Sequence, residues 1–182
     1  MLVLVLSFVT VLLDQAAKYL VLGHFYPGEV LPIVPGFFNL TSVRNTGAAW
    51  GMLGGFNGWL ALLSVVVLLL IVLFRRSFLT DSLTHRIALG CMIGGIVGNL
   101  VDRLRLQYVV DFLDFHWRDV YHFPSFNVAD SAICIGVGLY VLTAFLMSSH
   151  PLNAKGEPGP DEADGQPDTR PSGGTQMPAG SK

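Results

Sequence analysis

Four long apolar segments constrain this chain more than any other feature. They cover residues 2–22, 59–74, 87–103 and 128–147. Each comes close to the roughly 20 residues that a helix needs to cross the hydrocarbon core of a bilayer. A helix satisfies its own backbone hydrogen bonds in lipid, whereas an open sheet leaves its edges unpaired. The sequence therefore predicts an all-α membrane protein with four transmembrane helices.

The composition separates this membrane part from a polar tail. Hydrophobic residues make up 52% of the chain and charged residues only 13%, which is far from an ordinary soluble domain. The end of the chain is polar and rich in proline and glycine, so we expect a transmembrane domain over residues 1–147 and a disordered tail over residues 148–182. No basic stripe suggests a nucleic-acid partner.

Arginines between the second and third apolar segments predict the orientation. Arg75, Arg76 and Arg86 lie in one short connection, and the positive-inside rule places such a connection in the cytoplasm. Four spans then put both termini in the cytoplasm. The first segment lacks the basic start and small-residue cleavage site of a secretory signal peptide, so we expect it to remain as the first transmembrane helix.

Charged and amide side chains inside the apolar segments are expensive, and they mark candidate functional positions. Asp14 and Lys18 stand four residues apart, so they share a helix face and can form an ion pair. Asn99, Asp102 and Arg103 form a second cluster at the outer end of the third segment. Asp102 is expected chiefly to orient Arg103.

The third segment also carries glycines at every fourth position. Gly90, Gly94 and Gly98 form this stripe, with Gly95 beside it. Small residues at this spacing let another helix approach closely, so the stripe predicts helix packing.

Residues 23–57 differ from the apolar segments because prolines at positions 27, 32 and 35 exclude a long helix. Side chains from Phe37 to Arg44 alternate in character, which favours a short strand or hairpin at the membrane surface. Residues 104–127 are expected to form an external loop.

Two aspartates beside apolar segments, Asp111 and Asp130, are candidates for a catalytic pair. Two carboxylates within hydrogen-bonding distance cannot both ionise readily, so one keeps its proton while the other can deprotonate a water molecule. An aspartic protease requires this arrangement. Asp111 follows the third apolar segment by a short linker and Asp130 begins the fourth, so both should lie near the outer membrane surface.

A small proton-coupled transporter or channel is the alternative, because buried carboxylates also mark ion pathways. Asp14, Asp102, Asp111 and Asp130 would then form a relay. Against this reading, the polar residues cluster at the outer ends of the helices, and no inverted repeat relates the helix pairs.

Cysteines and histidines do not predict a metal site. Cys91 and Cys134 lie in apolar segments, where they act as small hydrophobic side chains. His85, His116 and His122 show no ligand-like spacing with cysteines or acids. The expected chemistry requires neither a metal nor an organic cofactor.

Five ordered motifs are more specific than any single residue. They are DQAAK at 14–18, VRNTGAAWG at 43–51, GGIVGNLVDR at 94–103, VVDF at 109–112 and FNVAD at 126–130. Over residues 14–138 the chain resembles the bacterial lipoprotein signal peptidases, the type II signal peptidases.

This resemblance implies a four-helix aspartyl endopeptidase of the bacterial inner membrane, with a small extracytoplasmic β-cradle. It would act as a monomer and remove signal peptides from prolipoproteins, cutting before the diacylglyceryl-modified cysteine of the lipobox. The resemblance makes Asp111 and Asp130 the catalytic dyad. The positions that would support or line the site are Asp14, Lys18, Asn45, Asn99, Asp102, Arg103, Asn127 and Ala129. We also hypothesise that Phe37, Phe38 and Trp50 clamp the peptide.

Overall fold

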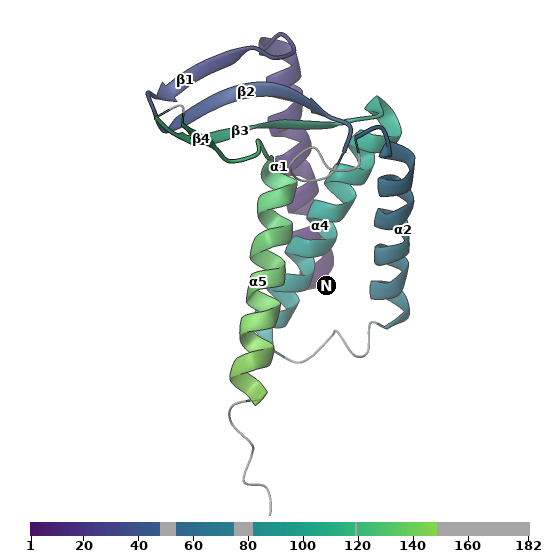
Figure 1. Cartoon of the computed structure of the whole chain (residues 1–182). Helices are drawn as coiled ribbons and strands as arrows, with labels where there is room; N and C mark the ends of the chain where they lie inside the picture. The colour runs from purple at the N-terminus through teal and green to yellow at the C-terminus, as the bar shows by residue number, and fades with distance from the viewer. Residues whose placement is uncertain (48–53, 75–81, 119, 149–182) are drawn as a thin grey trace, which may run out of the picture. The chain divides into compact units, whose positions relative to one another are not determined.

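The computed structural model describes residues 1–47, 54–74, 82–118 and 120–148. Its helices run side by side, and a small sheet lies across one end of them (Figure 1). Some sequence predictions concern residues outside these ranges, namely those on Trp50, Arg75, Arg76 and the tail from residue 149 onward.

Four helices account for the four apolar segments. They are α1 (Leu2–His24), α2 (Asn57–Leu73), α4 (Leu83–Leu106) and α5 (Val128–Ser148). Among the described residues, α1, α4 and α5 are long and apolar enough to cross a membrane, whereas α2 has 17 residues and is shorter. Three predicted spans are therefore confirmed as candidates, and the fourth stays a prediction.

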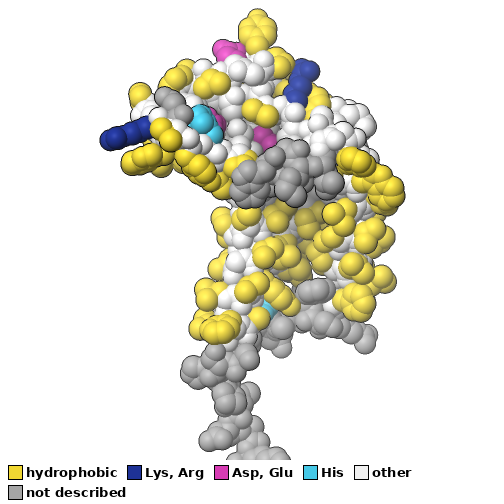
Figure 2. Space-filling view, viewed as in Figure 1, with side chains coloured by type: hydrophobic (Ala, Val, Ile, Leu, Met, Phe, Trp, Pro, Cys, Tyr) yellow, Lys and Arg dark blue, Asp and Glu magenta, His cyan; other side chains and the backbone are white. Residues whose placement is uncertain are grey.

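The apolar side chains of the helices face outward rather than into a core. On α1, Leu4, Phe8 and Leu12 recur every fourth residue and are 73%, 63% and 52% exposed. On the face shown in Figure 2, hydrophobic side chains cover the helical part, while the acidic side chains in view gather at the sheet end. A continuous exposed apolar surface of this kind suits contact with lipid.

Helix α4 packs against both α1 and α5 through its glycines. A Cβ atom on Gly90 would come within 2.7 Å of Leu6 Cβ, and one on Gly94 would come within 2.5 Å of Thr10 Cβ, both on α1. A Cβ on Gly95 would instead collide with the Ala129 carbonyl oxygen of α5. The predicted packing role of the glycine stripe is confirmed.

The sheet has four antiparallel strands in the order β1-β2-β3-β4. They are β1 (Val30–Val34), β2 (Phe38–Asn45), β3 (Val109–Trp117) and β4 (Tyr121–His122). The predicted hairpin is confirmed as β1 and β2. The predicted loop over residues 104–127 is wrong in part, because β3 pairs with β2 far back in the chain, a long-range contact that no local pattern reveals.

The sheet is anchored to the helices where α4 ends. The chain leaves α4 at Gln107, which adopts a left-handed conformation with φ of 67°, and turns directly into β3. Val110 and Phe112 of β3 then pack against Val21 of α1 in a buried apolar cluster. This anchoring holds β3 against one end of the helices.

Candidate active site

Asp111 lies on β3 and is 2% exposed. Both of its carboxylate oxygens accept hydrogen bonds from amides. Asn45 Nδ2, from the neighbouring strand β2, donates to Oδ2 at 2.8 Å, and Asn127 Nδ2 donates to Oδ1 at 2.7 Å. The side chain is thus held in one orientation from two sides.

Asp130 lies in the first turn of α5, where Asn127 precedes the helix. The backbone N–H of Asp130 donates to Asn127 Oδ1 at 2.9 Å, and the Asn127 N–H donates to Asp130 Oδ2 at 3.3 Å. This reciprocal pair is a capping box, which satisfies two backbone donors at a helix start. Asn99 Nδ2 donates to the other oxygen, Oδ1, at 2.7 Å.

Asn127 therefore connects the two aspartates. Its amide nitrogen binds Asp111, while its amide oxygen and backbone N–H bind Asp130. The residue is fully buried. The sequence predicts that Asp111 and Asp130 belong to one site. In the structure both residues are hydrogen-bonded to Asn127.

Beneath this pair, Lys18 is 2% exposed at the centre of a buried polar cluster. Its Nζ atom lies 2.8 Å from Asp14 Oδ2, 2.9 Å from Asp102 Oδ2 and 2.9 Å from Asn99 Oδ1. An ammonium group has three donors, and here each has an acceptor. The predicted Asp14–Lys18 pair is confirmed, with Asp102 as a second partner.

The two acids of this cluster, Asp14 and Asp102, also bind backbone beside Asp111 and Asp130. Asp14 Oδ1 accepts from the N–H of Ala129 at 2.9 Å, and Asp102 Oδ2 accepts from the N–H of Val110 at 3.1 Å. Ala129 immediately precedes Asp130, and Val110 immediately precedes Asp111. The polar cluster around Lys18 thus fixes the backbone immediately before Asp111 and immediately before Asp130.

Asp102 does not have the role predicted for it. Besides Lys18 and Val110, it accepts a 2.9 Å hydrogen bond at Oδ1 from Gln15 Nε2. Its oxygens are directed toward α1 and β3, so the prediction that it chiefly orients Arg103 is wrong. Asp102 binds Lys18 and Gln15 because of how α1 is rotated against α4. The position of Asp102 next to Arg103 in the sequence gives no information about that rotation.

Gln15 is a supporting residue that the sequence reasoning missed. Its Nε2 donates to Asp102 and also, at 3.1 Å, to the carbonyl oxygen of Gly98. Gln15 belongs to the DQAAK motif, in which the sequence reasoning gives a role only to Asp14 and Lys18. A polar side chain beside an intramembrane ion pair is the signal that would have found it.

Arg103 lies at a cavity of about 470 Å³ that both aspartates also line. Phe123, Phe126 and Ile133 supply part of its apolar wall. The Nε atom of Arg103 is buried and makes no hydrogen bond with the residues that the structure describes. Because Arg103 lines the cavity, its guanidinium group is suited to binding a ligand oxygen there.

The environment of Asp111 favours its protonated form. Burial, together with the charge of Asp130, raises the pKa of Asp111 to about 7. The hydrogen bonds from Asn45 and Asn127 act in the opposite direction, because they stabilise the carboxylate. A carboxyl group with this pKa can hold or release a proton near neutral pH, as acid-base catalysis needs.

The family model described as signal peptidase (SPase) II matches residues 6–146. The chain belongs to the signal peptidase II family. A lipoprotein signal peptidase of Pasteurella multocida is 46% identical over 144 residues, 77% of this chain and 86% of that protein. One from Syntrophotalea carbinolica is 42% identical over 142 residues, 76% of this chain and 88% of that protein.

A solved bacterial membrane enzyme structure, determined by the in meso method, has a TM-score of 0.73 to this chain at 33% identity. The match covers 84% of this chain and 92% of that one. The predicted resemblance is therefore confirmed. Membership of the signal peptidase II family supports a peptidase and gives no support to the transporter alternative.

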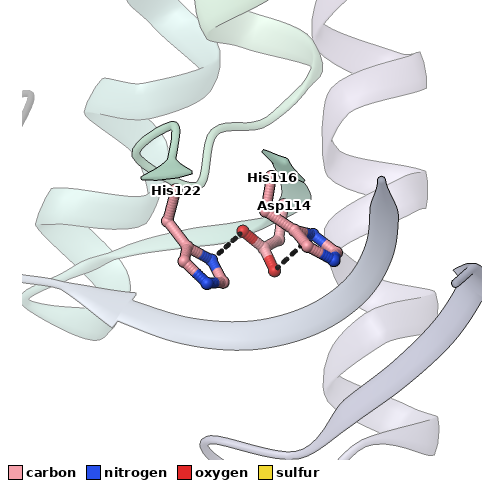
Figure 3. A group of neighbouring side chains, drawn as sticks. All are labelled: Asp114, His116 and His122. Atoms are coloured by element: carbon pink, nitrogen blue, oxygen red, sulfur yellow. Dashed lines mark ion pairs between the residues drawn. The ribbon is translucent and has the colours of Figure 1, made fainter. Parts of the chain in front are cut away.

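Histidines provide a second departure from the sequence reasoning. His116 and His122 lie on either side of Asp114 in the sheet, and their side chains point toward its carboxylate (Figure 3). Their spacing in the sequence does not predict that they lie beside an acid. Strand pairing brings them together instead, because His116 on β3 is directly opposite His122 on β4.

Proposed function

We propose that this chain is an aspartic endopeptidase that removes signal peptides from prolipoproteins, with Asp111 and Asp130 as its catalytic pair. One observation carries the proposal. Asn127 binds both carboxylates, and both line one cavity beside Arg103. Family membership supports signal-peptide cleavage as the overall activity.

In this mechanism the pair shares one proton. The ionised carboxylate takes a proton from a water molecule, which attacks the scissile carbonyl carbon. The protonated carboxyl group donates a hydrogen bond to the carbonyl oxygen and stabilises the charge that develops there. A proton then passes to the leaving amine. Because the two groups titrate together, the pair rather than either residue holds the proton.

Arg103 and the cavity support a peptide substrate. The guanidinium group of Arg103, which lines the cavity, is suited to donating to a backbone carbonyl oxygen of an extended peptide. Phe123, Phe126 and Ile133 provide apolar surface beside the dyad. We propose that the substrate carries diacylglycerol on a lipobox cysteine and is cut just before it, since acyl chains partition into the bilayer and bring the scissile bond laterally to the site.

The membrane arrangement follows from the same reading. We propose that α2 is the fourth span and that both termini lie in the cytoplasm. The sheet and the dyad then lie at the extracytoplasmic surface, where translocated prolipoproteins are exposed. The proposed enzyme works as a monomer in the inner membrane, and its cleavage step uses no metal or organic cofactor.

The proposed peptide clamp involves the turn between β1 and β2. Phe37 is 47% exposed, and its ring lies 5.6 Å from that of Phe115 on β3. Phe38 lies 4.7 Å from the same ring. Alanine at Phe37 should therefore weaken substrate binding more than folding. Unchanged cleavage of a lipidated substrate would exclude the clamp.

Cleavage of a diacylated lipobox peptide by the purified chain in detergent tests the proposed function. Asp111→Asn and Asp130→Asn should each abolish cleavage, because an amide cannot take a proton from water. Glu29→Gln removes an exposed acid of the sheet region and is the matched control, which should cleave normally. Circular dichroism must show that each variant is folded. Full activity in either folded aspartate variant would refute the dyad.

A further inference from the structure

A cluster of metal-binding side chains lies in the sheet, apart from the dyad. Asp114 and His116 belong to β3, and His122 belongs to β4. One ligand atom from each residue lies within 4.8 Å of the others. Figure 3 shows the two imidazole rings directed at the carboxylate from opposite sides.

We propose that Asp114, His116 and His122 bind a divalent transition-metal ion of the Zn²⁺ class. Two imidazoles and one carboxylate are a donor set that zinc commonly takes, with remaining positions left to water. The ion is separate from the cleavage step proposed above.

The distances suit an ion better than direct contacts. His122 Nδ1 lies 3.5 Å from Asp114 Oδ1, and His116 Nδ1 lies 3.8 Å from Asp114 Oδ2. Both separations are too long for a good hydrogen bond. Zinc bonds of about 2.0–2.2 Å place tetrahedral ligands about 3.3–3.6 Å apart, so small side-chain movements would bring the three donors onto one ion.

Two side chains of the cluster are largely buried, and the third is exposed to solvent. The side chains of His116 and Asp114 are 2% and 12% exposed, whereas that of His122 is 54% exposed. Strand pairing fixes the spacing, because His116 and His122 are opposite each other and their rings stack at 5.1 Å. An ion can therefore enter past His122 and meet two ligands that are already held.

A neighbouring amide supports the carboxylate. Asn39 on β2 pairs with Asp114 across the sheet, and its Nδ2 donates to Asp114 Oδ2 at 2.9 Å. Ligating carboxylates in proteins are commonly held by such outer hydrogen bonds, and their loss weakens metal binding by about 10–100-fold. Asn39 is therefore a positioning residue for the proposed site.

The site also faces the dyad region. Asp114 and His122 line a second cavity of about 710 Å³, to which Asn45 and Asp111 contribute as well. An ion held there would add a further link between β3 and β4, which among the described residues pair His116 with His122 and Trp117 with Tyr121. Metal binding should therefore raise the thermal stability of the protein.

Titration with Zn²⁺ alone tests the proposal, using the full chain in detergent after removal of any purification tag. Isothermal titration calorimetry should give one ion per chain, and thermal denaturation followed by circular dichroism should give a higher Tm with the ion bound. His122→Ala changes an exposed side chain, so it should fold normally and lose Zn²⁺ affinity by at least about tenfold. Asn39→Ala should weaken binding by about 10–100-fold.

His24→Ala is the matched control, because His24 is an exposed histidine at the end of α1 and should not affect binding. Substitution with Co²⁺ adds a readout that reports ligand geometry. It should give the visible absorption of a four-coordinate site in the wild type and lose it in His122→Ala. Absence of stoichiometric binding, or equal affinity in wild type and His122→Ala, would overturn the proposal. No peptide substrate enters these measurements, so their outcome is independent of the proposed peptidase.

Discussion

Asp14 accepts a 2.9 Å hydrogen bond from the backbone N–H of Ala129, the residue before Asp130. Asp102 does the same for Val110, the residue before Asp111. Lys18 binds both of these acids. One buried ammonium group therefore controls the backbone position of both members of the proposed dyad.

Lys18→Met should destabilise the protein strongly. The substitution keeps an unbranched apolar stem but leaves Asp14 and Asp102 buried without their cation. Removing one partner of a buried ion pair typically costs about 3–5 kcal/mol. The free energy of unfolding, measured by denaturant titration in mixed micelles, should fall by an amount of that order, and cleavage should be lost.

A triple variant controls for the charge itself. Asp14→Asn and Asp102→Asn combined with Lys18→Met remove all three charges, so much of the stability should return while the dyad remains displaced. Wild-type stability in the single Lys18→Met variant would contradict the central role of the lysine.

Gly98→Ala should impair the site through a steric contact. A Cβ atom at Gly98 would lie 2.6 Å from Asp14 Oδ2, so the carboxylate must move away from Ala129 and Lys18. Overpacking of this kind costs about 1–3 kcal/mol. We expect a lower free energy of unfolding and a lower kcat.

Gly138→Ala provides the comparison, since among the described residues nothing outside its own stretch of helix lies within 4 Å of a Cβ built there. That variant should be at least as stable as the wild type, because alanine is the better helix former. Equal behaviour of the two glycine variants would argue against the contact with Asp14.

Asn45→Ala should move the pH dependence of cleavage. The hydrogen bond from Asn45 lowers the pKa of Asp111, so its removal should raise that pKa above its present value of about 7. Activity requires one proton on the pair and declines when the last proton leaves. The alkaline limb of the kcat/KM profile should therefore shift to higher pH.

The shift in the Asn45→Ala profile must appear in kcat/KM, which reports the free enzyme. Glu29→Gln, which changes an acid in the same sheet region, should leave the limb in place. A lower kcat/KM at every pH without movement of the limb would mean that Asn45 positions Asp111 without tuning its acidity.

Local spacing predicted much of the site. The Asp14–Lys18 pair follows from helical periodicity, and the glycine stripe follows from a four-residue repeat. Both depend on residues within one helix, and the structure confirms both. The position of Asp111 and Asp130 beside apolar segments also predicted that both lie near helix ends, where the structure has them just after the end of α4 and at the start of α5.

Contacts between distant segments could not be predicted in this way. The binding of Asp102 to Lys18 depends on how α1 and α4 are rotated against each other, and the meeting of His116 with His122 depends on strand register. The sequence predicts a loop where β3 forms, because the pairing partner of β3, strand β2, lies far back in the chain. The spacing of residues along the sequence gives no information about how helices are rotated or how strands are aligned.

The hydrogen bond from Ala129 to Asp14 spans 115 residues of sequence. Helix α1 is made first, whereas α5 and its capping box come late in synthesis. A nascent chain that has inserted only its earlier helices lacks Asp130 and the amide of Asn127. The proposed catalytic pair is therefore complete only after the last helix has been synthesised and inserted.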